Sequence, residues 1–327
     1  LEWLWLAGEP VFTAGVRVCA PIFAVGRPQG AVSRRAGAAF RHLPALQLAP
    51  GELRSWPSWA GIVADVLGVP AVDHRGAGTL DDHCRATADF RDQYYGLIPY
   101  VFDEDEGRTD ERRFPRLTTT GLIDPGRSLW GLRSARFAKR TYTRPRVDVE
   151  RLRQESLLGP WSLARQVPKV LLATQTRVLE AVVDESGHWL PSTPTITVEA
   201  PPPRLWHVAA ALSSPPLAAL ALRRHAGAAL STDAIKLRAA DVAALPAPRP
   251  GADWDAGAAA LRAASAATSE PAWRQALRHV GSALCRAYRV DNADDLLGWW
   301  LGRLPAWRGA PADARSDRLS VELHDGP

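Results

Sequence analysis

Methionine is absent from this chain of 327 residues, and cysteine and lysine occur only three times each. The cysteines Cys19, Cys84 and Cys285 are odd in number and far apart, which is typical of a reducing compartment rather than of a disulfide framework. No run of about eighteen apolar residues predicts a membrane span, and the N-terminus lacks the pattern of a signal peptide. We therefore expect a cytoplasmic protein with no membrane partner.

The motifs of several enzyme classes are also missing. The sequence contains no P-loop, no GxSxG elbow and no HExxH zinc motif. Gly76-Ala77-Gly78 is the nearest approach to a cofactor loop, but Thr79 with Asp82 three residues later predicts a turn into a capped helix instead. His74, His83 and Cys84 are residue types that bind zinc, but their spacing fits no usual zinc motif, and structural or surface roles are favoured.

Positive charge comes almost wholly from arginine. Lys plus Arg is 40 against 35 for Asp plus Glu, a formal net charge of +5. Basic residues cluster between Arg127 and Arg153, where Trp130, Phe137 and Tyr142 are interleaved with them. Guanidinium groups match phosphates and guanine edges, and aromatic rings can stack on unpaired bases. The alternative is a solvated basic surface over three core aromatics. The residues expected to contact DNA in this segment are Arg133, Arg136, Lys139, Arg140, Arg144 and Arg146.

A strand is predicted from residue 169 to residue 178. Alternate positions place Lys169, Gln175 and Arg177 on one side, and apolar or β-branched residues on the other. Lysine suits phosphate, whereas glutamine and arginine can pair with adenine and guanine edges. We expect these three side chains to face DNA, and an amphipathic strand with a solvated polar face is the plain alternative.

The amino-acid sequence around this strand is more specific than its alternation of polar and apolar residues. PKVLLATQTRVLEAVVD at Pro168 is followed by Leu205-Trp206-His207, Ser213-Ser214-Pro215-Pro216, AIKL at Ala234 and LPAP at Leu245. Together with ATADFRDQYYGL, TTTGLIDPG and WWLGRLP elsewhere, these segments resemble the C-terminal target-recognition region of bacterial adenine-N6 DNA methyltransferases of restriction-modification and phage-defence systems. The resemblance implies double-stranded DNA as partner, and it adds Lys236 to the expected DNA-binding residues.

The resemblance also implies that the full-length protein binds S-adenosylmethionine and methylates a flipped adenine. The family's Asn/Asp-Pro-Pro-aromatic motif and glycine-rich cofactor turn are absent from this sequence. Leu1 is an unusual start, and the apolar runs Leu4 to Leu6 and Val16 to Val25 suit the closing antiparallel pair of a methyltransferase sheet. We therefore expect a piece of a longer protein, inactive alone, with no catalytic or cofactor-binding residue of its own.

The predicted fold class is α+β: terminal strands of a Rossmann-like methyltransferase sheet, then a mixed α/β target-recognition domain and a helical C-terminal module. Within it, residues 26–51 predict a loop, residues 53–67 and 80–91 predict helices, and residues 270–288 predict a helix whose apolar side is core. The expected parts are the catalytic sheet end (1–30), a linker and helical connector (31–100), the DNA-binding domain (101–250), the helical module (251–305) and a disordered tail (306–327).

Two other functional classes stay open. The chain could be a non-enzymatic DNA-binding or specificity subunit that works with a separate methylase chain. It could also be a nuclease or another effector of a defence system, for which Asp233 and Lys236 are the nearest approach to a carboxylate–lysine cluster. An in-frame Asn-Pro-Pro-aromatic motif upstream of the Leu1 codon would favour the methyltransferase over the separate subunit.

Overall fold

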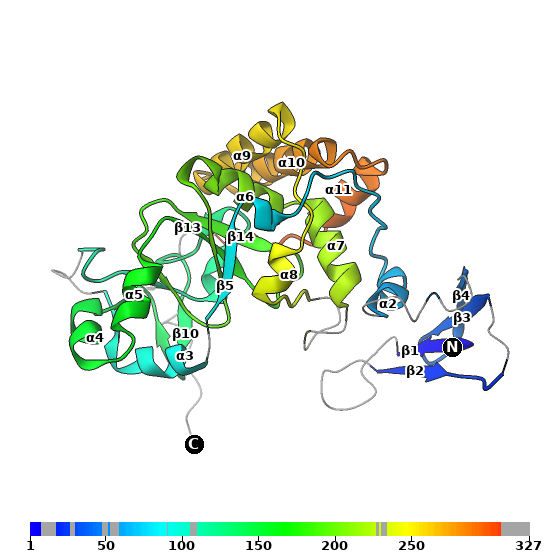
Figure 1. The fold of residues 1–327 in the computed structure, drawn as a ribbon, viewed down its shortest axis with the longest axis horizontal. Helices are drawn as coiled ribbons and strands as arrows, with labels where there is room; N and C mark the ends of the chain where they lie inside the picture. Colours follow the sequence, from blue (N-terminus) through cyan, green and yellow to red (C-terminus); the bar gives the residue numbers. More distant parts are fainter. Residues whose placement is uncertain are drawn as a thin grey trace, which may run out of the picture.

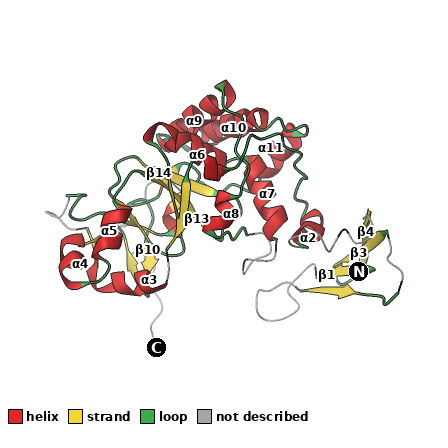
Figure 2. Cartoon of the chain, in the orientation of Figure 1, coloured by secondary structure: helices red, strands yellow, loops and turns green. Residues whose placement is uncertain are grey.

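The fold is α+β, as the sequence predicts at that level (Figures 1 and 2). The computed structural model describes residues 1–7, 18–26, 30–47, 52, 59–89, 91–104, 110–226, 229 and 234–308. Several small sheets lie beside two groups of helices, and the first sheet lies at one side of the molecule (Figure 1).

A four-stranded antiparallel sheet with the order β14-β13-β16-β5 lies at the centre of the protein. Its strands are β5 (Arg85–Ala88), β13 (Lys169–Ala173), β14 (Glu180–Asp184) and β16 (Ile196–Glu199). Helix α6 (Leu205–Leu212) packs on the face that holds Val170 and Leu172, whereas Ile123 packs on Leu171 from the other face. All residues of β13 and β14 are consequently buried. Residues 169–173 therefore present a polar face neither to DNA nor to solvent, because neighbouring elements cover both faces of the sheet, and the predicted strand ends at Ala173 rather than at residue 178.

A second four-stranded sheet has the order β15-β7-β12-β6. Its strands are β6 (Val101–Asp103), β7 (Arg116–Thr118), β12 (Pro145–Val147) and β15 (Trp189–Pro191). Three short helices share a separate core with it: α3 (Arg91–Leu97), α4 (Val149–Glu155) and α5 (Gly159–Arg165). Two hairpins complete this half of the protein. They are β8 (Ile123–Asp124) with β9 (Arg127–Ser128), and β10 (Ala135–Phe137) with β11 (Arg140–Tyr142).

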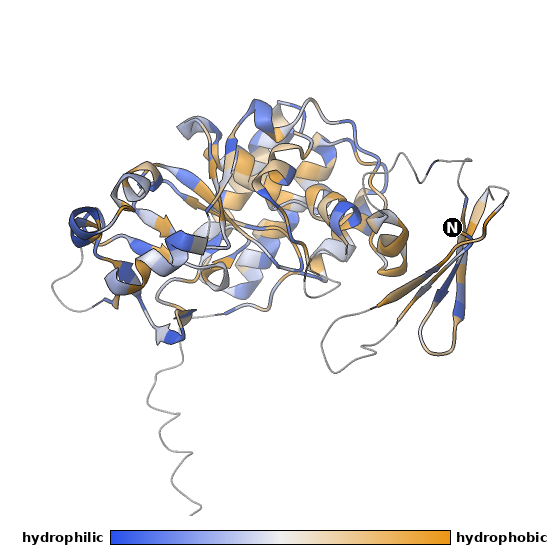
Figure 3. Ribbon diagram, turned by 60° about the horizontal axis from the view of Figure 1, so that its bottom comes forward, coloured by the Kyte–Doolittle hydropathy of each residue, from blue (hydrophilic) through white to orange (hydrophobic). Residues whose placement is uncertain are grey.

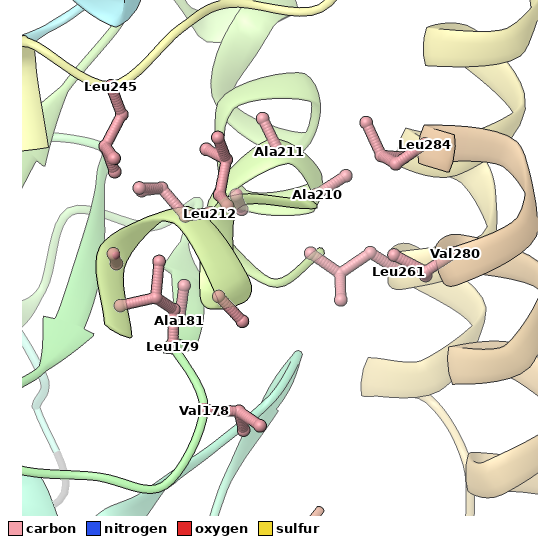
Figure 4. Close-up of a cluster of buried hydrophobic side chains, with 14 of the residues drawn as sticks. Val178, Leu179, Ala181, Ala210, Ala211, Leu212, Leu245, Leu261, Val280 and Leu284 are labelled. Atoms are coloured by element: carbon pink, nitrogen blue, oxygen red, sulfur yellow. The ribbon is translucent and has the colours of Figure 1, made fainter. Parts of the chain in front are cut away.

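Five further helices contribute to the largest core, which they share with α6 and the central sheet. They are α7 (Pro215–His225), α8 (Ala239–Ala243), α9 (Ala252–Ser265), α10 (Glu270–Ala287) and α11 (Ala293–Leu301). Helix α10 begins at the predicted position, and the five predicted core residues are fully buried: Trp273, Leu277, Val280, Leu284 and Tyr288. Figure 4 shows the core between Leu212 of α6 and Leu284 of α10, with Leu179 and Ala181 of the central sheet region nearby. In Figure 3 hydrophobic residues concentrate in the middle of the main body, where the helices meet the sheet.

The N-terminal sheet has the order β2-β1-β3-β4. Strands β1 (Trp3–Leu6) and β2 (Cys19–Ile22) pair antiparallel, as predicted, although residues 8–17 lie outside the described part. The loop predicted for residues 26–51 is wrong, because it holds β3 (Ala31–Ala36) and β4 (Arg41–Gln47). Strand β3 alternates strictly, with Val32, Arg34 and Ala36 buried. The Arg34 guanidinium donates to the Pro44 carbonyl at 2.8 Å, and this hydrogen bond offsets part of the cost of burying the charged group.

The helix predicted for residues 80–91 is also wrong. A single 3₁₀ turn, Leu80–Asp82, precedes β5, which pairs with β16. The predicted cap is present, since the Asp82 carboxylate accepts from the Thr79 N–H at 2.8 Å. Of the helix predicted for residues 53–67, the structure contains α2 (Ala60–Val66), and residues 53–58 lie outside the described part. Residues 309–327 of the predicted tail and Asp233 of the nuclease alternative lie outside it as well.

No described helix by itself has the length and apolar character needed to cross a membrane. The two segments Pro202–Leu212 and Pro215–His225 meet those criteria only as a pair bent by 60°.

Candidate nucleic-acid interface

A cavity of about 420 Å³ opens beside the end of β13 and the start of β14. Three residues predicted to contact DNA come together there, although they lie up to 44 positions apart: Arg133, Gln175 and Arg177. Charged, polar and apolar groups share the rest of the wall, including Ile123, Asp124, Thr174, Glu180, Pro194, Pro305 and Arg308. The cavity is therefore a polar site assembled from four separate parts of the chain.

A tight backbone turn after β13 exposes the predicted base-reading residues. Gln175 has a φ of +66°, a left-handed conformation that few non-glycine residues adopt. Its N–H donates to the Ile235 carbonyl at 2.8 Å, and the Ile235 N–H donates to the Thr176 carbonyl at 2.7 Å. Gln175 and Arg177 consequently project outward, and the antiparallel bridge places the exposed Lys236 beside Gln175 along the backbone. Ile235 of the AIKL segment forms an isolated bridge with Thr176.

Two carboxyl groups at the cavity were missed from the sequence. Asp124, the last residue of β8, is 5% exposed, and Glu180, the first residue of β14, is 8% exposed. The Asp124 Oδ2 atom is buried with no hydrogen-bond partner among the described residues, and none of those residues forms a hydrogen bond with the Glu180 side chain. Asp124 follows the TTTGL segment, and Glu180 occurs in an apolar strand. The only sequence signal for these two cavity residues is therefore a charged residue next to or within apolar residues.

Burial controls the protonation of both groups. Desolvation raises the pKa of Asp124 to about 6, and Arg308, Arg127 and Arg133 oppose this shift. Desolvation also raises the pKa of Glu180 to about 8, with a further upward contribution from Asp124. Arg308 and Arg133 again act in the opposite direction. At neutral pH Glu180 is therefore mostly a neutral acid, which could donate one hydrogen bond as well as accept.

The hairpin of β10 and β11 presents the second set of predicted residues. Ala138 and Lys139 have φ values of +48° and +66°, the conformation of a two-residue type I′ turn. Arg136, Lys139 and Arg140 are exposed, and no residue in the described ranges forms an ion pair with any of them. Figures 1 and 2 show β10 beside α3.

Helix α3 holds this hairpin in place. The Tyr94 hydroxyl accepts a hydrogen bond from the Ala138 N–H at 2.8 Å, and its ring packs on Phe137 with centroids 4.6 Å apart. Phe137 and Tyr142 are buried. They are therefore core residues, and the expectation that they stack on bases is wrong.

Lys169 cannot make the expected phosphate contact. Its side chain is fully buried, and its Nζ atom lies 2.6 Å from Oδ2 of Asp184. Desolvation lowers the pKa of Lys169, while Asp184 opposes that shift. Asp184 also accepts from the N–H groups of Gly187 and Trp189, both at 2.9 Å. The ion pair joins the ends of β13 and β14, and the hydrogen bonds of Asp184 hold the turn that leads to β15.

Arg146 is likewise unable to reach DNA. It is buried, donates from Nε to Glu104 at 2.9 Å, and donates from Nη1 to the Phe114 carbonyl at 2.7 Å. Arg144 is more than half exposed, but its Nη1 atom lies 2.9 Å from the second oxygen of the same Glu104. Both guanidinium groups also lie over Trp130, at 4.9 and 5.5 Å from the ring centroid. The expectation for Arg146 is therefore wrong, and the charge of Arg144 is already paired.

The Gly76–Gly78 turn does not form a cofactor loop. A side chain at Gly76 would meet the Ala247 carbonyl at 2.5 Å, and the Ala77 N–H donates to that carbonyl at 3.0 Å. The glycine turn is thus packed against the protein itself, and only the three-residue turn Leu80–Asp82 follows it rather than a helix. The described part of the chain likewise has no group of three or more His, Cys, Asp or Glu side chains that could hold a metal ion.

No protein-family model matches the chain, and no curated protein matches it. Its function is therefore inferred from the exposed basic residues of the β10–β11 hairpin and from the cavity.

Proposed function

We propose that this chain is the DNA-recognition part of a site-specific adenine-N6 DNA methyltransferase, with the cofactor-binding and catalytic residues outside it. The observation that carries the proposal is the exposed basic tip of the β10–β11 hairpin, formed by Arg136, Lys139 and Arg140. In contrast, three exposed arginines and the half-buried Arg274 each have a carboxylate partner: Arg151 with Glu155, Arg262 with Glu185, Arg274 with Glu270 and Arg286 with Asp253. Basic groups that lack a protein partner are suited to phosphate oxygens.

The basic hairpin and the turn that holds Gln175 and Arg177 would make different contacts with DNA. The hairpin would lie along the phosphate backbone and set the orientation of the protein, together with Arg133 and Lys236. Gln175 and Arg177 project from a backbone turn that hydrogen bonds to Ile235 hold rigidly, and rigid positioning is what base readout requires. A glutamine can pair in two-point fashion with adenine and an arginine with guanine.

The N-terminal sheet supports the methyltransferase part of the proposal. Strands β1 and β3 are parallel, while β2 and β4 on the outside are antiparallel to their neighbours. A mixed sheet with antiparallel edge strands is common where a mostly parallel α/β sheet ends. The missing catalytic residues would belong to the same polypeptide or to a partner methylase subunit.

The test is binding of the chain to duplex DNA over a series of salt concentrations, by fluorescence anisotropy. We expect Arg136→Ala/Lys139→Ala/Arg140→Ala to bind all sequences more weakly and to flatten the log–log salt dependence by about one unit for each phosphate that the variant no longer neutralises. The matched control is Arg262→Ala/Arg274→Ala/Arg286→Ala, which removes the same formal charge from ion-paired positions. Equal slopes for the hairpin variant and the wild-type protein would overturn the proposal.

Sequence readout is tested separately in the complete enzyme. Gln175→Ala and Arg177→Ala should relax the preference for the methylation site, since each base contact discriminates by about 1–3 kcal/mol. Methylation-site profiling measures this, with melting curves to exclude unfolding. Variants that keep the parental preference would show that the two side chains are solvated rather than in contact with bases.

A further inference from the structure

The cavity beside Gln175 has a chemistry that phosphate binding does not explain. Its most buried titratable groups, Asp124 and Glu180, are acidic, and they repel phosphate whenever they are ionised. Both residues are buried, with exposed fractions of 5% for Asp124 and 8% for Glu180, and both line the open space. Buried polar groups normally have hydrogen-bond partners, so unsatisfied ones require an explanation. A ligand whose N–H groups donate to these carboxyl oxygens is such an explanation.

The surrounding arginines do not satisfy these carboxyl groups. Arg133 donates from Nη1 to the Gly121 carbonyl at 3.0 Å. No ion pair joins Arg133 or Arg308 to Asp124 or Glu180 within the described ranges. The site therefore combines acceptors at its base with guanidinium and amide donors nearer its opening, where Gln175 is exposed.

The size and walls of the cavity suit a planar ring. Its volume of about 420 Å³ falls within the range of roughly 300–1,000 Å³ that is usual for small-molecule sites. Ile123, Pro194 and Pro305 supply apolar wall surface between the polar groups. Enzymes and readers that take a base out of the DNA stack hold it in this way, between apolar side chains with hydrogen bonds to its edge.

Among the nucleobases, guanine best matches both sets of groups. Its N1–H and N2–H groups are parallel neighbours that one ionised carboxylate can accept together, and donation from both would hold that carboxyl group in its ionised form. Its O6 and N7 atoms are adjacent acceptors, to which an arginine or amide can donate. Adenine, cytosine and thymine each lack the pair of neighbouring donors.

We propose that this cavity binds an unpaired guanine base, with Glu180 and Asp124 accepting from its N–H groups and Arg133 and Gln175 donating to its acceptor edge. The inference rests on the proposed function in one respect, namely that DNA supplies the guanine. A free guanine nucleotide would offer the same chemistry.

Calorimetric titration with guanosine monophosphate tests the site, because it does not depend on duplex binding. We expect inosine monophosphate, which lacks the 2-amino group, and adenosine monophosphate to bind at least about tenfold more weakly. Glu180→Gln and Asp124→Asn should each weaken guanosine monophosphate by a similar factor. Glu155→Gln, on the exposed surface of α4, is the matched control, and melting curves check that each variant is folded. Equal binding of the three nucleotides, no binding of any, or an unaffected Glu180→Gln variant would overturn the proposal.

A second titration identifies the source of the base. A single-stranded oligothymidine with one guanine should bind more tightly than oligothymidine alone if DNA supplies it, and this difference should vanish in Glu180→Gln. Binding of the free nucleotide without that difference would support a guanine nucleotide site. The outcomes remain separable from the proposed function: a salt-dependent duplex complex without guanine binding rejects only this inference, and guanine binding without a duplex complex rejects only the DNA-recognition proposal.

Discussion

Lys169 and Asp184 form the most deeply buried ion pair of the described residues, and each depends on the other. Lys169→Ala should lower the free energy of unfolding by about 3 kcal/mol, because removal of one partner leaves the other charge buried. Urea denaturation measures the loss. Gln175→Ala, at the exposed turn after the same strand, should stay within about 0.5 kcal/mol of the wild-type protein. A Lys169→Ala variant as stable as Gln175→Ala would show that the buried pair is not what holds this end of the sheet.

Glu180 should make stability depend on pH. Its pKa is raised from 4.5 to about 8 in the folded protein. The stabilisation is fully present below pH 4.5 and is lost as the pH rises through about 8, because the unfolded chain releases the proton earlier. The free energy of unfolding should fall by up to about 1.4 kcal/mol per pH unit in this window.

Urea denaturation at pH 5, 6, 7 and 8 tests this dependence. Glu180→Gln should flatten it, and taking the difference between the two proteins removes the contributions of histidines and other groups that titrate in the same range. Parallel curves for wild-type protein and variant would contradict the raised pKa.

At the scale of single residues, the sequence predicts the charge of a side chain but not whether the side chain is exposed or buried. The exposure of Arg136 follows from alternation along β10, whereas Lys139 lies in the hairpin turn and Arg140 directly after it. The burial of Arg146 could not be foreseen, because its partner Glu104 lies 42 positions earlier and the two meet only through the pairing of β12 with β6. Glu180 was missed for a related reason, since a strand pattern does not reveal a cavity at the strand's end.

At the scale of elements, close packing of helices α9 and α10 requires glycine. A methyl group at Gly257 would approach Leu284 Cδ2 to 2.0 Å, whereas no atom lies within 4 Å of the same position at Gly298 on α11. Gly257→Ala should therefore destabilise the protein by about 1–3 kcal/mol through overpacking. Gly298→Ala should stabilise it by up to about 1 kcal/mol through helix propensity. Thermal melts of the two variants provide the comparison, and equal shifts would contradict this packing.

Elements with local signals were predicted well. Helix α10 follows from its apolar period and the proline in its first turn. Strand β5 was mistaken for a helix because its partner β16 lies more than a hundred residues later in the chain. Strands β3 and β4 were missed because arginine, proline and glycine obscure the alternation of polar and apolar residues in this segment. The buried face of β3 is defined only by its packing against Ile62 of α2.

At the scale of the whole molecule, the C-terminal helices support the candidate interface. Their core is continuous with the central sheet, and Trp254, Trp273 and Trp300 are fully buried in it. The Trp273 indole donates to the Pro125 carbonyl at 3.1 Å, directly beside Asp124 at the cavity. The helical module thereby fixes one wall of the cavity, and Pro305 at the end of the module also lines it.

The most direct test of DNA recognition is amide hydrogen exchange with and without duplex DNA. We predict slower exchange on DNA binding in residues 133–142 and 174–177, where the basic hairpin and the exposed turn would contact the duplex. Helices α4 and α10 should exchange at unchanged rates, because they lie outside the proposed interface. Protection confined to the C-terminal helices, or none in residues 133–142, would contradict the proposal that this surface grips DNA.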